Sequence, residues 1–188
     1  MGYFTAVLDA DPTSPAGLVS HHHIQTGYED PQGLAELARV ADAVTAEFGN
    51  VPAAALAALA AQRPVSPAAS AVSVAQDRAR EKAHFVACGV PCAPYAVIET
   101  AEQLAAVSPD LLPGILKTAR MGYDGKGQVR VKTPAELAAA WDSVGQVPCV
   151  LEKMLPLQLE CSVIVARGAD GAMVHLPVQR NLHRDGIL

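Results

Sequence analysis

The chain has 188 residues and a net charge of −5, with 51% hydrophobic and only 4% aromatic residues. Nucleic-acid-binding domains are normally basic, so this acidic balance argues against a nucleic-acid partner. No apolar stretch reaches the roughly 18 residues of a membrane span, and the N-terminus "MGYFTAVLDADP" lacks the cationic start of a signal peptide. Four scattered cysteines favour reduced thiols in a cytoplasmic protein.

Taken in chain order, the first 65 residues alternate between strand and helix patterns. The apolar run "YFTAVLDAD" predicts a buried strand, and the Pro/Ser/Gly segment "PTSPAG" predicts a loop. The next pattern, "DPQGLAELARVADAVTAEF", predicts a helix followed by a short strand. "NVPAAALAALAAQ" predicts another helix, with Asn50 as its cap and Pro52 in its first turn. This alternation is typical of a parallel α/β unit.

The remainder has a different pattern. Residues 66–89 predict a helical region that ends at Gly89, followed by an extended stretch and a helix capped by Thr100. Strands are then predicted at "GILKTA", "QVRVK", "PCVLEKML" and "LECSVIVARG", with the helix "TPAELAAAWDSV" between the second and third, and strand and loop after the fourth. This order suits an α+β domain with an antiparallel sheet. We therefore expect two domains, 1–66 and 67–188, and a fragment that lacks both ends of a longer protein.

Three consecutive histidines, His21 to His23, suggest a metal site at first sight. Adjacent residues on a strand point to opposite faces, so three neighbours do not converge on one ion. We expect a strand edge or a loop here, and assign no metal ligand.

The stretch "KTARMGYDGKGQVRV" combines positive charge with three glycines between two predicted strands. Glycines let backbone N–H groups approach phosphate oxygens, and Lys117 and Lys126 supply charge that a phosphate would balance. The pattern is neither a P-loop nor a dinucleotide fingerprint, because a strand follows it instead of a helix. A glycine-rich hairpin with solvated charges is the alternative, and Arg120 and Arg130 fit either interpretation.

Two downstream segments favour a nucleotide. The strand ending in "LEKML" could present its backbone to the donor and acceptor of an adenine ring. Glu160 begins an apolar strand, where its carboxylate could accept hydrogen bonds from ribose hydroxyls. Each feature by itself is also typical of a solvated strand end; their order along the chain is more specific.

The motifs "ILKTARMGYDGKGQ", "LEKMLPLQLECSVIVARG" and "NLHRDGIL" resemble the ATP-grasp superfamily, and within it the N5-carboxyaminoimidazole ribonucleotide synthase family. The upstream segments "VLDADPTSPAG", "TAEFGNVP" and "AQDRAREK" resemble that family's first domain and linker. The resemblance implies an α/β fold: a partial Rossmann-like pre-ATP-grasp domain followed by an incomplete α+β ATP-grasp domain.

The resemblance also implies the site residues. Lys126 and Asp124 would be catalytic, and the substrate side would carry Glu47, Tyr123 and Asp124. The ATP-binding residues would be Arg78, Lys117, Gly122, Tyr123, Asp124, Gly125, Lys126, Gly127, Gln128, Glu152, Lys153, Met154, Leu155, Glu160 and His183.

The implied reaction converts ATP, bicarbonate and 5-aminoimidazole ribonucleotide to the N5-carboxylated product, ADP and phosphate in purine biosynthesis. Mg²⁺ would assist the phosphoryl transfer, and the family's metal ligands would lie beyond Leu188. We therefore expect an ATP-dependent ligase family that is cytoplasmic and homodimeric when full length, and no turnover by this piece. Another ATP-grasp purine-pathway ligase, a nucleotide-binding module without turnover, and an interaction domain remain the alternatives.

Overall fold

The computed structural model describes residues 2–122, 127–168 and 170–182. The chain forms two compact units, Met1–Val90 and Pro91–Leu188, which we describe one at a time. None of the helices in these described ranges is both long enough and apolar enough to cross a bilayer.

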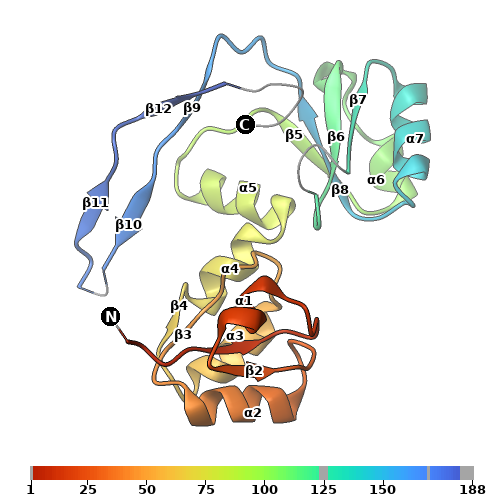
Figure 1. The fold of residues 1–188 in the computed structure, drawn as a ribbon. Coiled ribbons are helices and arrows are strands. Elements are labelled where there is room, and N and C mark those ends of the chain that lie inside the picture. The colour runs from red at the N-terminus through yellow and green to blue at the C-terminus, as the bar shows by residue number, and fades with distance from the viewer. Residues whose placement is uncertain (1, 123–126, 169, 183–188) are drawn as a thin grey trace. The chain divides into compact units, whose positions relative to one another are not determined.

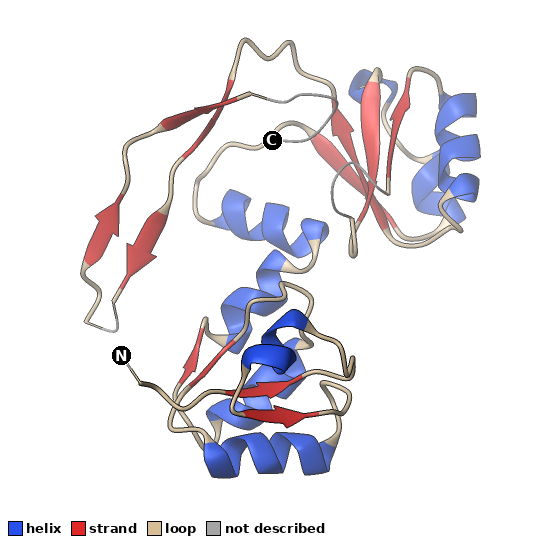
Figure 2. Ribbon diagram, viewed as in Figure 1, coloured by secondary structure: helices blue, strands red, loops and turns tan. Residues whose placement is uncertain are grey.

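The first unit alternates short strands and helices (Figures 1 and 2). Its strands form two separate parallel pairs, β1 with β2 and β3 with β4. Leu37 and Ala38 of α2 and Leu59 of α3 form its buried core. In chain order the elements are β1 (Ala6–Leu8), α1 (Pro15–Val19), β2 (His22–Ile24), α2 (Pro31–Val40), β3 (Val44–Thr45), α3 (Ala53–Ala60), β4 (Val65–Ser66), α4 (Ala69–Ala75) and α5 (Arg78–Ala87).

The helix ends of this unit correct three predictions. The segment predicted as a loop contains the first residues of α1, whose N-cap Ser14 accepts a hydrogen bond from the Gly17 N–H. Asn50 does not cap α3; Pro52 holds that position, without a side-chain bond. The single helical region predicted over 66–89 is two helices. Asp77 caps the second by accepting from the N–H groups of Ala79 and Arg80, so its extended backbone ends the first.

The predicted domain boundary after residue 66 falls at the end of β4. In the structure the next two helices stay with the first unit, because α4 contacts α3 and α5 contacts α4. The first compact unit thus extends to Val90, where Gly89 adopts a positive φ of 73° just after α5.

The second unit is built on a four-stranded antiparallel sheet with the strand order β5-β8-β6-β7. Ile98, Leu116 and Leu151 are fully buried in its core, and each contributes about 1.5–3 kcal/mol by leaving water. Leu137 and Trp141 of α7 pack on the same cluster. The elements are β5 (Tyr95–Ile98), α6 (Ala101–Ala105), a 3-10 turn (Pro109–Leu111), β6 (Gly114–Thr118), β7 (Gln128–Val131), α7 (Pro134–Ser143) and β8 (Cys149–Lys153).

The predicted cap of α6 is confirmed: Thr100 and Gln103 form a reciprocal capping box. The segment "LECSVIVARG", predicted as one strand, is two. β9 (Glu160–Ser162) pairs with β12 (Gln179–Asn181), and β10 (Val165–Arg167) pairs with β11 (Met173–His175), both antiparallel. The ladder is interrupted at Val163 and Ile164, which separate the two strands.

Candidate functional site

The four-stranded sheet of the second unit has two different faces, because successive side chains of a strand alternate. Leu116 and Leu151 lie opposite each other in the register and belong to the core cluster, together with residues of α7. The alternate residues of the same strands, Lys117 on β6 and Glu152 on β8, therefore project from the second face. Charged side chains are thus placed on a sheet whose other face packs against the hydrophobic core.

Lys117 and Glu152 form an ion pair on this second face. The Lys117 Nζ donates to Glu152 Oε2 at 2.9 Å, and the two side chains are 21% and 17% exposed. Lys117 lies directly opposite Val150, so the contact is a diagonal one across adjacent strands. Val150 is fully buried without belonging to the core cluster. The pair holds an ammonium group at a fixed place on a partly desolvated surface.

The glycine-rich segment begins at the end of the strand that carries Lys117. The two ends of this segment meet, since the Thr118 N–H donates to the Gly127 carbonyl at 2.8 Å. Gly127 has a φ of 69°, and a Cβ there would lie 2.6 Å from Thr118 Oγ1, so both backbone and space require glycine. Gln128 begins β7, and Gly122 is the last described residue before the segment resumes at Gly127. The predicted residues Tyr123, Asp124, Gly125 and Lys126 lie outside the described residues.

The backbone at the end of β8 is partly used within the protein. The Lys153 N–H donates to the Pro94 carbonyl and the Met154 N–H to the Pro113 carbonyl, both at 2.9 Å. The side chains of Met154 and Leu155 are 40% and 42% exposed. This segment therefore combines a fixed backbone with accessible apolar side chains.

Glu160 lies on β9, opposite Asn181 of β12. Its Oε1 accepts from Asn181 Nδ2 at 3.0 Å, and Asn181 Oδ1 accepts from the Ser162 hydroxyl at 2.9 Å. The carboxylate of Glu160 is exposed and oriented by this chain of bonds. The predicted His183 lies outside the described residues.

Two predicted residues belong to the first unit. Arg78 is the first residue of α5. Glu47 follows β3 and is exposed, and it lines a cavity together with Asp9 and Tyr28. The Tyr28 hydroxyl donates to Asp9 Oδ2 at 3.2 Å. Burial raises the pKa of Tyr28, and the negative charges of Asp9 and Glu47 raise it further.

Asp9 and Tyr28 were not predicted as site residues. The sequence signal for Asp9 is its position directly after the first strand. Ligands bind at the carboxyl ends of parallel strands in α/β sheets.

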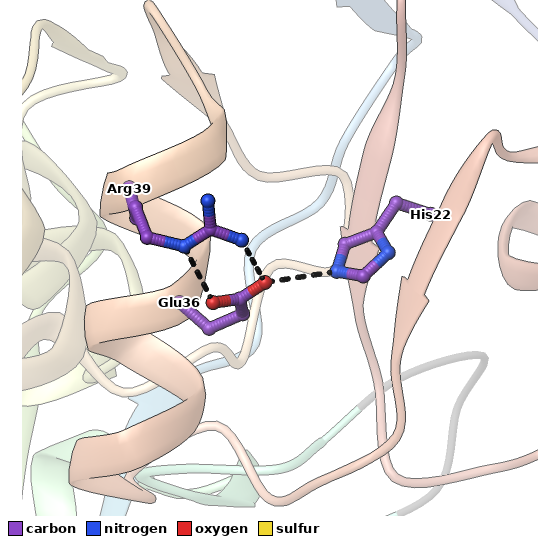
Figure 3. A network of polar contacts seen from close by, with 3 residues as sticks. All are labelled: His22, Glu36 and Arg39. Atoms are coloured by element: carbon purple, nitrogen blue, oxygen red, sulfur yellow. Dashed lines mark hydrogen bonds and ion pairs between the residues drawn. The ribbon is translucent and has the colours of Figure 1, made fainter.

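The three histidines have three separate sets of partners. His21 Nδ1 contacts the Thr5 N–H and hydroxyl, and His23 Nε2 contacts the Asp9 carbonyl. His22 Nε2 lies 3.2 Å from Glu36 Oε1, and Arg39 holds both oxygens of the same carboxylate (Figure 3). The Arg39 guanidinium, with a smaller effect of His22, holds the pKa of Glu36 below its ordinary value. His22–Ile24 forms a strand, which was one of the two structures expected for this segment. The described residues contain no cluster of three metal-ligating side chains.

The comparison with protein families places these features in a known fold. A family model described as the ATP-grasp domain matches residues 83–188, more than half of the chain. The chain belongs to the ATP-grasp family. A second model, described as the ribonucleotide synthetase preATP-grasp domain, matches residues 1–76. The predicted fold class, a pre-ATP-grasp domain followed by an ATP-grasp domain, is therefore confirmed.

Individual relatives agree. An N5-carboxyaminoimidazole ribonucleotide synthase of Brucella melitensis is 39% identical over 190 residues, which cover all of this chain and 52% of that protein. An N5-carboxyaminoimidazole synthetase from Staphylococcus aureus complexed with ADP is 32% identical, with a TM-score of 0.91 over 100% of this chain and 50% of its own. The synthase from Aspergillus clavatus in complex with ADP and 5-aminoimidazole ribonucleotide is 26% identical, with a TM-score of 0.81 over 97% and 48%. The chain spans about half the length of the curated relatives it matches.

Proposed function

We propose that this ATP-grasp chain carries the ATP-binding part of an enzyme that carboxylates 5-aminoimidazole ribonucleotide. The reaction uses bicarbonate and ATP, and gives N5-carboxyaminoimidazole ribonucleotide, ADP and phosphate. The observation that supports this proposal most directly is the Lys117 ammonium, which Glu152 holds at 2.9 Å on the strand that leads into the glycine-rich segment. Relatives named N5-carboxyaminoimidazole ribonucleotide synthase match the chain over its full length.

Lys117 is the proposed contact for the ATP phosphates. A triphosphate carries more charge than a carboxylate, so it would compete with Glu152 for an ammonium already held on the sheet. Glycines 122, 125 and 127 would let backbone N–H groups approach the same oxygens, and Gln128 and Arg78 would add polar contacts. Lys126 and Asp124 are the proposed catalytic residues. Asp124, Tyr123 and Glu47 would face the ribonucleotide.

The adenine ring is proposed to bind at Glu152 to Leu155. Because the N–H groups of Lys153 and Met154 already donate to carbonyls of the protein, the backbone donor we assign to an adenine nitrogen is that of Leu155. The exposed side chains of Met154 and Leu155 would contact the ring. Glu160, oriented by Asn181, is the proposed ribose acceptor, and His183 would complete the nucleotide contacts.

Mg²⁺ is the proposed metal of the reaction, and would neutralise charge on the transferring phosphoryl group. The described residues do not fit a site for it, since no three ligating side chains gather there. We place the ligands beyond Leu188, and derive no step through the metal. A cytoplasmic location and a homodimer of the full-length enzyme complete the proposal.

Calorimetric titration with Mg-ATP tests nucleotide binding by the 188-residue chain, which we expect to be saturable. The chemistry is tested in a chimera in which the chain replaces the region that it matches in the Staphylococcus aureus relative, so that the relative supplies the rest of the protein. This chimera is expected to release ADP only when both 5-aminoimidazole ribonucleotide and bicarbonate are present. A folded chimera that binds ATP but is indifferent to the ribonucleotide would contradict the proposed substrate. The isolated chain is expected to bind ATP without turnover, and ribonucleotide-dependent ADP release by it would contradict the assignment of the metal ligands.

A further inference from the structure

The C-terminal end of α5 carries two metal-ligating side chains next to each other. His84 and Cys88 are four residues apart, so they lie on the same face of the helix. The Cys88 Sγ lies 3.7 Å from the His84 Nε2, and both residues are exposed. Neither is among the residues that we assign to the nucleotide. A thiol and an imidazole nitrogen thus face each other at a surface that solvent ions can reach.

The backbone holds these two residues in place. The Cys88 N–H donates to the His84 carbonyl at 3.0 Å, and it also lies 3.1 Å from the Phe85 carbonyl. Cys88 is the C-cap of α5, with φ −84° and ψ 2°, and the next residue, Gly89, turns the chain away with a φ of 73°. A ligand that binds both side chains therefore has no backbone to order, which lowers the entropic cost of binding.

The distance between the two donor atoms fits a shared metal ion. Zinc binds cysteine sulfur at about 2.3 Å and histidine nitrogen at about 2.05 Å, and its usual geometry is tetrahedral. Two such bonds at the tetrahedral angle place the sulfur and the nitrogen about 3.6 Å apart. The observed 3.7 Å corresponds to an angle of about 116° at the ion. An ion can therefore enter between Cys88 and His84 with almost no movement of either side chain.

The charged neighbours on the same helix also favour a cation. Glu81 lies three residues before His84, on the same face, and adds a negative charge. Arg80 lies four residues before His84, but its guanidinium donates to the Ser73 hydroxyl at 3.0 Å. This bond directs the positive charge of Arg80 toward α4.

We propose that His84 and Cys88 form a two-residue binding site for a divalent cation of the zinc class. The Cys88 sulfur and the His84 Nε2 supply two of the four ligands, and water supplies the other two. On binding, the thiol proton of Cys88 passes to the solvent and a metal–sulfur bond takes its place. A thiolate ligand favours zinc-like ions over Mg²⁺ and Ca²⁺, which prefer oxygen. The ion adds a side-chain link across the last turn of α5, and this inference is independent of the proposed nucleotide chemistry.

The test is a titration of the 188-residue chain with Co²⁺, a spectroscopic probe for zinc sites, in the presence of a phosphine reductant. We expect a saturable thiolate-to-cobalt charge-transfer band in the near ultraviolet, which Zn²⁺ abolishes and Mg²⁺ leaves unchanged. The band requires a cysteine ligand, so it distinguishes this site from the three histidines 21–23. Amide hydrogen exchange at Cys88 is expected to slow when Zn²⁺ binds, because the ion closes the same turn.

Variants of the exposed residues test the geometry. Losing a residue that only supports a metal ligand typically weakens binding about 10- to 100-fold, so His84→Ala and Cys88→Ala should each weaken it at least about tenfold. The double variant Ala83→His, His84→Ala keeps one histidine but moves it to another face of α5, and should bind as weakly as His84→Ala. Cys161→Ser removes a different exposed cysteine and should bind like the original chain.

Circular dichroism verifies that each variant is folded before its affinity is compared. Three results would each overturn the proposal: no thiolate band at millimolar Co²⁺, an unchanged affinity in His84→Ala or in the double variant, and loss of the band in folded Cys161→Ser. The first would leave the contact between Cys88 and His84 as an ordinary hydrogen bond. The other two would place the ion on a different cysteine or on a cysteine without its histidine.

Discussion

Replacing Lys117 by methionine separates the role of its charge from the role of its packing. The methionine keeps an unbranched apolar side chain on the sheet and removes the ammonium that lies 2.9 Å from Glu152. A hydrogen bond to a charged group contributes about 1.5–3 kcal/mol. Since the two side chains are 21% and 17% exposed, solvent screens the pair, and we expect a loss of about 1–2 kcal/mol in the free energy of unfolding.

The loss of the Lys117 ammonium is expected to weaken nucleotide binding more than it weakens folding. If Lys117 contacts the ATP phosphates, its loss removes one charge-assisted bond and weakens Mg-ATP binding by about 10- to 150-fold. Calorimetric titration at 150 mM salt measures the dissociation constant, and urea unfolding measures the stability of the same sample. Binding is compared without urea, at a temperature where both proteins are folded.

Lys132→Met is the matched control, because it removes an equal charge from an exposed position just after β7. Its effects on stability and ATP affinity are expected to be small, within about 0.5 kcal/mol. Undiminished ATP affinity in folded Lys117→Met would refute the phosphate contact. An equal loss in both variants would show that ATP responds only to net charge.

Three further predictions concern the packing around this site. Burial raises the pKa of the Cys149 thiol to about 11 from an ordinary value near 9. As the pH rises, the unfolded chain therefore loses this proton before the folded chain does, and the free energy of unfolding should fall between about pH 9 and 11. Urea unfolding across that range measures the fall, which should be smaller in Cys149→Ala. Leu151→Ala removes a fully buried side chain and should cost about 2–5 kcal/mol in the same assay, whereas Leu157→Ala, 73% exposed, should cost under about 0.5 kcal/mol. Gly127→Ala should destabilise by about 1–2 kcal/mol, since the new Cβ meets Thr118 Oγ1 at 2.6 Å with φ at 69°; an unchanged urea midpoint would show that the turn relaxes at no cost.

Local patterns predicted the elements well where a single segment decides its own structure. Thr100 caps α6 as expected, because the capping box needs only residues three apart. The strands at 114–118, 128–131 and 149–153 lie inside the predicted apolar runs. The family followed from motifs whose residues are contiguous, and the match of the ATP-grasp model to 83–188 confirmed it.

Predictions failed where a distant partner decides the local structure. Nothing in "LECSVIVARG" separates β9 from β10; the break follows from their different partners, β12 and β11. A propensity scale for single segments does not include such partners.

The sequence by itself determined the residue types, their spacing and the family: glycines and Lys117 before a strand, Glu152 at the end of another, and Glu160 beyond it. Only the tertiary structure decided that Lys117 and Glu152, 35 residues apart, share one bond. That contact exists because β8, a later strand in the chain, lies between β5 and β6 in the sheet, and strand order is set by the packing of side chains on both faces.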